Sequence, residues 1–379
     1  MYAGNNRRRG INRVRKVTLV TATPGPVRLR RTGPGVAVEK SMDMSKIKRI
    51  LIVRTDRIGD VVLSTPAITA ARKAFPDAYI ACLVSEATRD IVQGNPYINE
   101  VIVFSRKHTL RLSGYLRAKR FDLALILHST ARINILCFLA GIPRRMGYAR
   151  HKMDFFLTDR LAYTKGMGRK HESEYSLDVL RCMGIKAESS PLVMPLSITD
   201  ENVAKRLLLE NGIKEGERFL MIHPGASHVS KVWGLENFAK VSDILSERFS
   251  LKIVLVSSAA QAGIGERVRD LMKHRPVFLC GKTPLKVLAA LLKRSSLFIS
   301  NDSGPVHIAC AVGAGVISIF SRNEKGLSPA RWGPLGKRTA VLHKDVGCVE
   351  CLAHNCKKGF LCLNSITVEE VVKKAEELL

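Results

Sequence analysis

The sequence predicts an α/β protein made of two doubly wound, Rossmann-like domains that face a cleft. Two regions, 48–150 and 219–320, alternate apolar strands with amphipathic helices. Such repetition requires parallel sheets that helices cover on both faces, and ligands then bind at the carboxyl ends of the strands. The 379 residues suffice for two or three domains, and a hydrophobic content of 46% supplies a large core.

In the first half, short apolar runs predict buried strands, and the amphipathic segments between them predict helices. We expect strands at 50–53, 79–84, 100–104 and 123–127, and helices at 61–75, 86–93, 108–119 and 133–140. The pattern loosens after Gly141, and we interpret residues 144–152 as a basic loop region. A helix at 171–183 and an extended connection at 191–195 complete this half.

The second half repeats this alternation. We expect strands at 219–222, 252–256, 277–279, 297–299 and 316–320, and helices at 200–211, 235–249, 265–273, 285–292, 306–312 and 367–379. Thr367 is placed to cap the last helix, because two glutamates follow in its first turn. We therefore predict a disordered basic arm at 1–46, a first domain at 47–195 and a second domain at 196–379.

Positive charge dominates the chain. It has 61 Lys and Arg against 33 Asp and Glu, a net charge of +28. This excess predicts an anionic partner, and nucleic acid, anionic lipid and a phosphorylated glycolipid all fit. No apolar run reaches the roughly 18 residues that span a bilayer. The N-terminus lacks the apolar region of a secretory signal, so we expect a cytoplasmic protein.

Residues 296–322 contain the strongest local signal for a ligand site. A strand leads into a turn and a helix start at Asp302-Ser303-Gly304. Backbone N–H groups at a helix start bind phosphate, whereas the carboxylate of Asp302 would accept hydrogen bonds from a sugar hydroxyl. His307, one turn into the helix, would add a hydrogen-bond donor. Helix capping alone is the alternative explanation of Asp302 and Ser303.

Asp60 and Lys231 follow the ends of two other strands. Asp60 opens a helix whose dipole would keep the carboxylate ionised, and an ionised carboxylate in a cleft suits a general base. A simple helix cap is the alternative. Ser227 and Lys231 follow the strand at 219–222, where a hydroxyl and an ammonium group can hold a diphosphate. A solvated surface lysine is the alternative for Lys231.

Four segments, in order, resemble glycosyltransferase family 9, the lipopolysaccharide heptosyltransferases. They are ILIVRTDRIGDVVLSTPAI at 50–68, FLMIHPGASHVSKVWGLENFAKV at 219–241, NDSGPVHIACAVGAGVISIF at 301–320, and RWGPLGKR with the cysteine-containing segment that runs to Ile366. The similarity spans about residues 48–379. It implies the two-domain fold called GT-B, in which domain 47–195 binds the acceptor and domain 196–379 binds the nucleotide sugar.

The resemblance also implies an activity and a set of site residues. The reaction would be an inverting transfer of heptose from ADP-heptose to the lipopolysaccharide inner core, with no cofactor required for catalysis. Asp60 matches the base proposed for the family. Ser227, Lys231 and the 303–304 amides would hold the diphosphate of the sugar donor, and Asp302 would orient the sugar.

A group of cations in the first domain would bind an anionic glycolipid acceptor. Its members are Arg54, Arg57, Arg132, Arg144 and Arg145. Taken singly, an arginine of this kind is more often a solvated surface residue than a ligand, so we treat the five as a group. Such an acceptor lies at the inner leaflet, so we expect a cytoplasmic protein held peripherally on the inner face of the inner membrane.

Four of the nine cysteines are clustered. They are Cys348, Cys351, Cys356 and Cys362. Their spacing is close to that of a structural zinc site, and free thiols are the alternative in a reducing cytosol. Similar cysteines occur in many members of the family, so the cluster does not by itself indicate a different function.

Two other functions remain open. One is a related family 9 transferase that uses another sugar donor. Residues 256–259 also depart from the glycine-rich turn that the family usually has near the ribose, so the nucleotide base is the least determined part of the donor. A basic nucleic-acid-binding protein with a cysteine metal module is the more distant alternative. An aromatic content of 6% and the lack of a recognisable binding motif oppose it, so we expect no nucleic acid partner.

Overall fold

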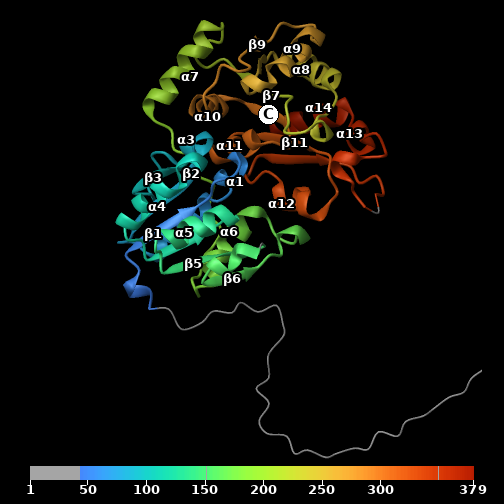
Figure 1. Ribbon diagram of the computed structural model, residues 1–379. Coiled ribbons are helices and arrows are strands. Elements are labelled where there is room, and N and C mark those ends of the chain that lie inside the picture. Colours follow the sequence, from blue (N-terminus) through green and yellow to red (C-terminus); the bar gives the residue numbers. More distant parts are fainter. Residues whose placement is uncertain (1–42, 151, 349) are drawn as a thin grey trace, which may run out of the picture. The chain divides into compact units, whose positions relative to one another are not determined.

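Two six-stranded sheets, each wholly parallel, organise the protein (Figure 1). The computed structural model describes residues 43–150, 152–348 and 350–379, which belong to one compact unit. The predicted arm therefore lies outside the described residues up to position 42. Its last residues, Met44–Lys46, form a single 3-10 turn, η1, instead of the disordered chain that we expected there.

The first sheet has the strand order β3-β2-β1-β4-β5-β6. The chain runs outward from β1 in one direction and then from β4 in the other, so the switch point between them is where a ligand would bind. Its strands are β1 (Arg49–Val53), β2 (Tyr79–Ser85), β3 (Glu100–Phe104), β4 (Leu123–Ile126), β5 (Arg144–Ala149) and β6 (Asp159–Ala162). In β1, Ile50 faces Ile80 on one side and Leu123 on the other, which fixes the register.

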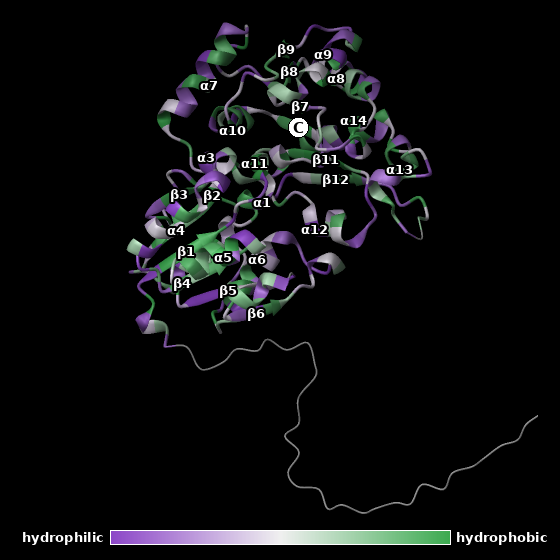
Figure 2. Cartoon of the chain, viewed as in Figure 1, coloured by the Kyte–Doolittle hydropathy of each residue, from purple (hydrophilic) through white to green (hydrophobic). Residues whose placement is uncertain are grey.

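Helices cover both faces of this sheet, because alternate residues of β1 point to opposite sides. Leu51 packs with α4 (Thr109–Ala118) and α5 (Ala131–Leu139). Ile50 packs with α2 (Thr65–Ala74), α3 (Arg89–Val92) and α6 (Glu172–Arg181). Figure 2 shows β1 as a hydrophobic strand within this layered arrangement, while α7 alternates between hydrophilic and hydrophobic residues, as an amphipathic helix does.

The second sheet repeats the topology, with the order β12-β11-β10-β7-β8-β9 and a switch point between β7 and β10. Its strands are β7 (Phe219–His223), β8 (Lys252–Leu255), β9 (Val277–Phe278), β10 (Leu297–Asn301), β11 (Val316–Phe320) and β12 (Thr339–His343). One face packs with α8 (Leu235–Phe249), α9 (Ala262–Leu271) and α14 (Val368–Leu378). The other packs with α7 (Ile198–Glu210), α10 (Leu285–Arg294) and α11 (Gly304–Ala311). Short helices α12 (Pro329–Trp332) and α13 (Leu361–Asn364) follow later.

The two halves meet through α1 (Ile58–Val62), which contacts α11. Two glycines allow this close approach. A Cβ atom on Gly59 would lie 2.7 Å from Cδ2 of His307, and one on Gly304 would lie 3.2 Å from Cβ of Ile58. Because larger residues would separate the helices at this point, the glycines bring the first turn of α1 against the start of α11.

Three expectations about secondary structure were wrong. The helix expected at 61–75 is interrupted and forms α1 and α2, because Pro66 cannot donate a backbone hydrogen bond inside a helix and instead lies at the start of α2. The basic loop expected at 144–152 contains β5, in which Met146 and Tyr148 are buried. Strands β6 and β12 were missed, because both are short and carry charged or polar residues.

The expected capping of the last helix is confirmed, since Thr367 and Glu370 form a capping box at the start of α14. All strands of the first sheet precede residue 195 and all strands of the second follow residue 196, although the domain boundary itself stays a prediction.

Among the described residues, no helix has both the length and the apolar character needed to cross a bilayer.

Candidate active site

The ends of the strands beside both switch points contribute to two cavities. The larger cavity, about 470 Å³, lies against the ends of β7 and β10 and is lined by Ser227, Lys231 and Asp302. The smaller cavity, about 380 Å³, lies against the ends of β1 and β4 and is lined by Arg54 and His128. Both cavities therefore lie where doubly wound sheets bind their ligands.

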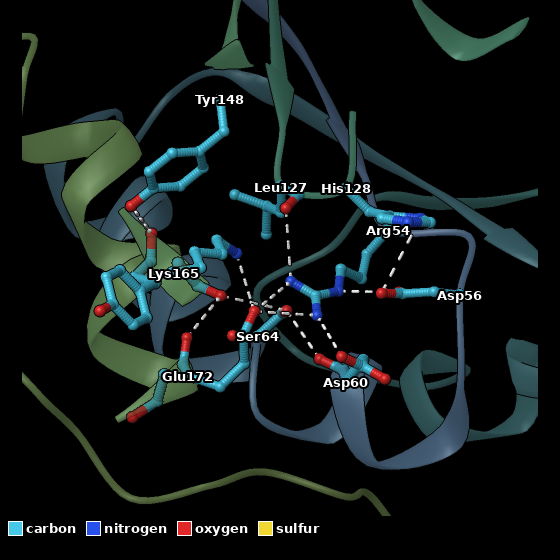
Figure 3. Close-up of polar contacts among 12 residues, drawn as sticks. Arg54, Asp56, Asp60, Ser64, Leu127, His128, Tyr148, Lys165 and Glu172 are labelled. Atoms are coloured by element: carbon cyan, nitrogen blue, oxygen red, sulfur yellow. Dashed lines mark hydrogen bonds and ion pairs between the residues drawn. The ribbon is translucent and has the colours of Figure 1, made fainter. Parts of the chain in front are cut away.

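Asp60 lines both cavities, together with Arg57 and Trp332. It is the third residue of α1, and its side chain is only 13% exposed. Its Oδ1 accepts a hydrogen bond from Nη2 of Arg54 at 2.6 Å (Figure 3). The carboxylate is thus held in one place at the junction of the two cavities, which a residue that only caps a helix would not require.

Burial raises the pKa of Asp60 to about 6. The Arg54 guanidinium opposes this shift, while the charges of Asp56 and Glu172 add to it. Burial therefore has the largest effect on the pKa of this carboxyl group. A carboxylate with this pKa is still mostly ionised at neutral pH and is well matched to the work of a general base.

Arg54 is held by three carboxylates. Its Nε donates to Asp56 at 2.8 Å, and both terminal nitrogens contact Oε1 of Glu172, at 3.2 and 3.1 Å (Figure 3). Its side chain is only 3% exposed. A cation that binds the acceptor would be expected to face an open surface. The Arg54 guanidinium does not, and instead it fixes the orientation of Asp60.

Glu172 is the centre of a buried charge cluster. Besides Arg54 it binds Nζ of Lys165 at 2.8 Å and, through Oε2, Nε and Nη2 of Arg331 at 3.0 and 2.7 Å. Burial alone would raise the pKa of Glu172, but Lys165, Arg54 and Arg331 outweigh it and lower the pKa to about 2. Arg331 belongs to α12 of the second half, so Glu172 connects that half to the arginine that positions Asp60.

In the larger cavity, the start of α11 offers backbone N–H groups to a ligand. Ser303 is the N-cap residue, but its hydroxyl contacts Oγ of Ser300 at 2.9 Å and makes no capping bond to the helix. Asp302 forms an ion pair with Lys231, whose Nζ also lies 3.4 Å from the Asp302 carbonyl oxygen. Helix capping alone therefore does not explain Asp302 and Ser303, and the ion pair holds the Lys231 ammonium group beside the helix start.

His307 also lines the larger cavity but is 97% buried, given its exposed fraction of 3%. Burial lowers its pKa to about 3, so the imidazole is neutral at physiological pH. Among the described residues, its Nδ1 has no hydrogen-bond partner. A neutral ring with an unpaired nitrogen is consistent with the expected polar contact to a ligand.

Of the predicted acceptor-binding cations, Arg57 lines both cavities and Arg54 lines the smaller one. Arg57 is also exposed. Arg132 is exposed on α5 and is not among the residues that line these two cavities. Arg144 forms a two-point ion pair with Asp159, at 3.0 and 2.9 Å, and Arg145 donates to backbone carbonyl groups, 2.6 Å from that of Phe156. Both arginines stabilise β5 in these contacts, so their predicted role at the acceptor stays a prediction.

Sequence reasoning missed several residues of the site. In the smaller cavity these are Lys165, Glu172 and Arg150; in the larger cavity, Gln261 contacts the carbonyl oxygen of Ala226 at 2.5 Å. Nothing in the spacing of these residues marked them. Arg331 and Trp332 were within the RWGPLGKR segment, which signalled the region but no specific role.

The four clustered cysteines line a third cavity of about 340 Å³, called here the cysteine cavity. All four are free thiols of intermediate exposure, and Sγ of Cys362 lies 2.8 Å from the Ser321 carbonyl oxygen. Within the described residues, no three Cys, His, Asp or Glu side chains are arranged to hold a metal ion. The predicted structural zinc at Cys348, Cys351, Cys356 and Cys362 stays a prediction.

Comparison with known proteins adds the family. The profile described as "Glycosyltransferase family 9 (heptosyltransferase)" matches residues 109–361, more than half of the chain. Lipopolysaccharide heptosyltransferase 3 of Escherichia coli K12 is 27% identical over 337 residues, which are 85% of this chain and 95% of that protein.

Two solved structures are similar in fold. The glycosyltransferase family 9 structure from Veillonella parvula has a TM-score of 0.77 at 24% identity and covers 89% of this chain and 98% of that one. The E. coli structure titled ADP-heptose lps heptosyltransferase II has a TM-score of 0.74 at 21% identity and covers 87% of this chain and 98% of that one. The predicted GT-B fold is confirmed by these likenesses.

Proposed function

The chain belongs to glycosyltransferase family 9, and we propose that it transfers a heptose from ADP-heptose to the lipopolysaccharide inner core. The observation that carries this proposal is the position of Asp60, which lines both cavities. A nucleotide sugar in the larger cavity and an acceptor in the smaller one would meet at this carboxylate. The named activities of the similar proteins support the choice of heptose and of ADP.

The reaction is a single displacement at the anomeric carbon. The acceptor hydroxyl oxygen attacks that carbon, the bond from the carbon to the diphosphate oxygen breaks, and ADP leaves, so the configuration inverts. Asp60 accepts the proton of the hydroxyl as the new bond forms. Arg54 keeps the carboxylate in place, which reduces the reorganisation that the transition state requires.

The sugar donor lies in the larger cavity. Its diphosphate meets Ser227, Lys231 and the N–H groups of Ser303 and Gly304 at the start of α11, and the positive charge of Lys231 stabilises the leaving group. Asp302 accepts hydrogen bonds from sugar hydroxyls. No metal has a role in this assignment, and we expect the rate to be unchanged by EDTA.

The acceptor is an anionic glycolipid in the smaller cavity, where Arg57 and Arg150 supply positive charge. Because such a lipid is anchored in the inner leaflet, the protein acts in the cytoplasm, peripherally on the inner face of the inner membrane.

The experiment that tests this function is transfer by the purified full chain to a deep-rough lipopolysaccharide. We expect the acceptor to gain the mass of one heptose from ADP-heptose. A gain only with another nucleotide sugar would overturn the choice of donor. If no nucleotide sugar is consumed and the protein instead binds a specific RNA at physiological salt, the assignment as a heptosyltransferase is wrong.

The rate of transfer should depend on pH through Asp60. Its pKa of about 6 lies above the ordinary value, so the carboxyl group becomes protonated, and loses its function as a base, as the pH falls through 6. We expect kcat/KM to fall about tenfold per pH unit below that point and to be level above it. Initial rates from pH 4.5 to 8, at constant ionic strength, measure this; a level profile across the range contradicts it.

Replacing Lys231 by methionine should lower kcat by about 10²- to 10³-fold, because the leaving diphosphate loses a preorganised positive charge. Steady-state rates of ADP release measure the loss. Lys240→Met, at an exposed lysine on α8, is the matched control and should leave kcat unchanged. A Lys231→Met variant as active as the control would remove Lys231 from the site.

A further inference from the structure

An unusual group of apolar side chains is exposed on the outer side of the first half. Phe155 is 59% exposed, Phe138 48% and Met153 39%. The two phenylalanines belong to one cluster, since the Phe156 ring lies 4.2 Å from that of Phe155 and 4.7 Å from that of Phe138, centroid to centroid. Exposed apolar groups that gather in this way mark an interaction site more often than isolated ones do.

The elements that carry this group lie next to one another. Phe138 is on α5, and Met153 and Phe155 are on the 3-10 helix η4 (Lys152–Phe156), which packs against α5. Helix α4 also packs against α5, and its Leu110 side chain is 77% exposed. Because α4 and α5 cover the same face of the first sheet, their outer sides form one continuous surface.

Exposed cations occur on the same elements and in the segments beside them. They are Arg106, Lys107, Arg111, Arg117, Arg120, Arg132, Arg150 and Lys152. The single acidic residue in these three elements, Asp154, is buried. Lys119, just after α4, is paired with Glu100 at 2.9 Å, whereas no ion pair joins any of the eight cations to a described carboxylate. Exposed apolar side chains on basic elements without paired carboxylates are typical of surfaces that enter the headgroup region of an anionic bilayer.

Two elements of this surface are connected along the chain to residues of the smaller cavity. Ser129 and Arg150 line that cavity, and the chain leads from them directly into α5 and η4. Asp154 ties the two elements together at the cavity wall: it accepts hydrogen bonds from Ser129 at 3.2 Å and from Asn134 at 2.8 Å. The segments that carry the aromatic side chains are thus joined to the wall of the smaller cavity through the contact between Asp154 and Ser129.

We propose that this surface, formed by Leu110, Phe138, Met153, Phe155 and the eight cations, inserts into the interface of an anionic lipid bilayer and brings the smaller cavity to it. The inference deepens the proposed function and rests on it, since a lipid-anchored acceptor is what makes the placement useful. A second copy of the chain is disfavoured as the occupant, because two such surfaces would bring like charges together without a carboxylate between them.

A tryptophan at position 155 tests the insertion directly. The full chain with Phe155→Trp is mixed with vesicles that contain phosphatidylglycerol, and the wild-type signal of Trp233 and Trp332 is subtracted. We expect the tryptophan emission to shift to the blue and to be quenched by lipids with brominated acyl chains. Leu209→Trp, at a residue of α7 with 48% exposure, is the matched control and should show neither effect. The basic arm attracts both variants equally, so equal or absent quenching in the two overturns the proposal.

A second pair of variants connects the surface to transfer. Phe138→Ser/Phe155→Ser should weaken vesicle binding by about 10- to 100-fold and slow transfer to an acceptor embedded in vesicles. Transfer to a water-soluble, delipidated acceptor should be unchanged. The control is Ile198→Ser/Leu209→Ser, which removes exposed apolar residues from α7. Weakening of vesicle binding by both pairs alike contradicts the assignment of the surface.

The outcomes separate this proposal from the proposed function. If the wild-type protein transfers no heptose even to the soluble acceptor, the proposed function fails, while quenching of Phe155→Trp still decides whether the surface inserts. If the fluorescence responds to a structured RNA and not to vesicles, the surface binds nucleic acid and the lipid proposal is wrong.

Discussion

Replacement of Asp60 by asparagine is expected to lower kcat for heptose transfer by about 10²- to 10⁴-fold, the range that a general base contributes. The amide has nearly the same shape but cannot accept the proton of the attacking hydroxyl. The affinity for ADP, measured by calorimetry, should be retained, because Ser227 and Lys231 are unchanged. The thermal midpoint should also change little, since Arg54 keeps Asp56 and Glu172 as partners.

Asp56→Asn is the matched control for this variant. It also removes one carboxylate from Arg54, since Oδ1 of Asp56 lies 2.8 Å from Nε of Arg54. Asp56 lines the smaller cavity but is not among the residues that line the larger one. We expect it to lower kcat by less than about tenfold, because it does not take up the proton. Equal losses in the two variants would indicate that Asp60 acts only through the charge balance of Arg54.

The second large effect is on stability. Glu172→Gln leaves Arg54, Lys165 and Arg331 around a neutral amide in a site where Glu172 is 1% exposed. Removal of one partner from a buried ion cluster leaves uncompensated charge and costs about 3–5 kcal/mol. We expect the free energy of unfolding in urea to fall by that amount. The remaining activity should also change its pH dependence: the charge of Glu172 raises the pKa of Asp60, so the acid limb should move to lower pH.

Glu174→Gln, two residues further along α6, is the control. Glu174 is 30% exposed and pairs with Arg181 at 2.7 Å, so its loss should cost less than about 1 kcal/mol. If the two glutamine variants are equally stable, the buried cluster contributes little to the connection between the halves.

The parts of the site that follow strands could be predicted from the sequence. Apolar runs ending at Val53, Ile222 and Ile299 mark buried strands, and a parallel sheet brings their carboxyl ends together. Asp60, Ser227 and Lys231 were found in this way and indeed line the cavities. The family resemblance supplied their roles, which periodicity cannot provide.

The network behind Asp60 could not be predicted, because its members come from distant segments. Arg54, Glu172 and Arg331 meet only when α6 and α12 are packed against the end of β1. Arg54 was therefore interpreted as a free cation for the acceptor, although its charge is satisfied internally. Strand β5 was missed for a related reason: Arg144 and Arg145 suggest an exposed loop until Asp159 and the Phe156 carbonyl group are seen beside them.

The sugar donor and the acceptor should meet at Asp60, and a crystal structure with a non-transferable ADP-heptose analogue would show where the donor lies. We expect the diphosphate at Lys231 and the start of α11, with the anomeric carbon no more than about 6 Å from the Asp60 carboxylate, which leaves room for one hydroxyl group between them. A sugar that points away from Asp60, or an ADP group bound outside the larger cavity, would contradict the account.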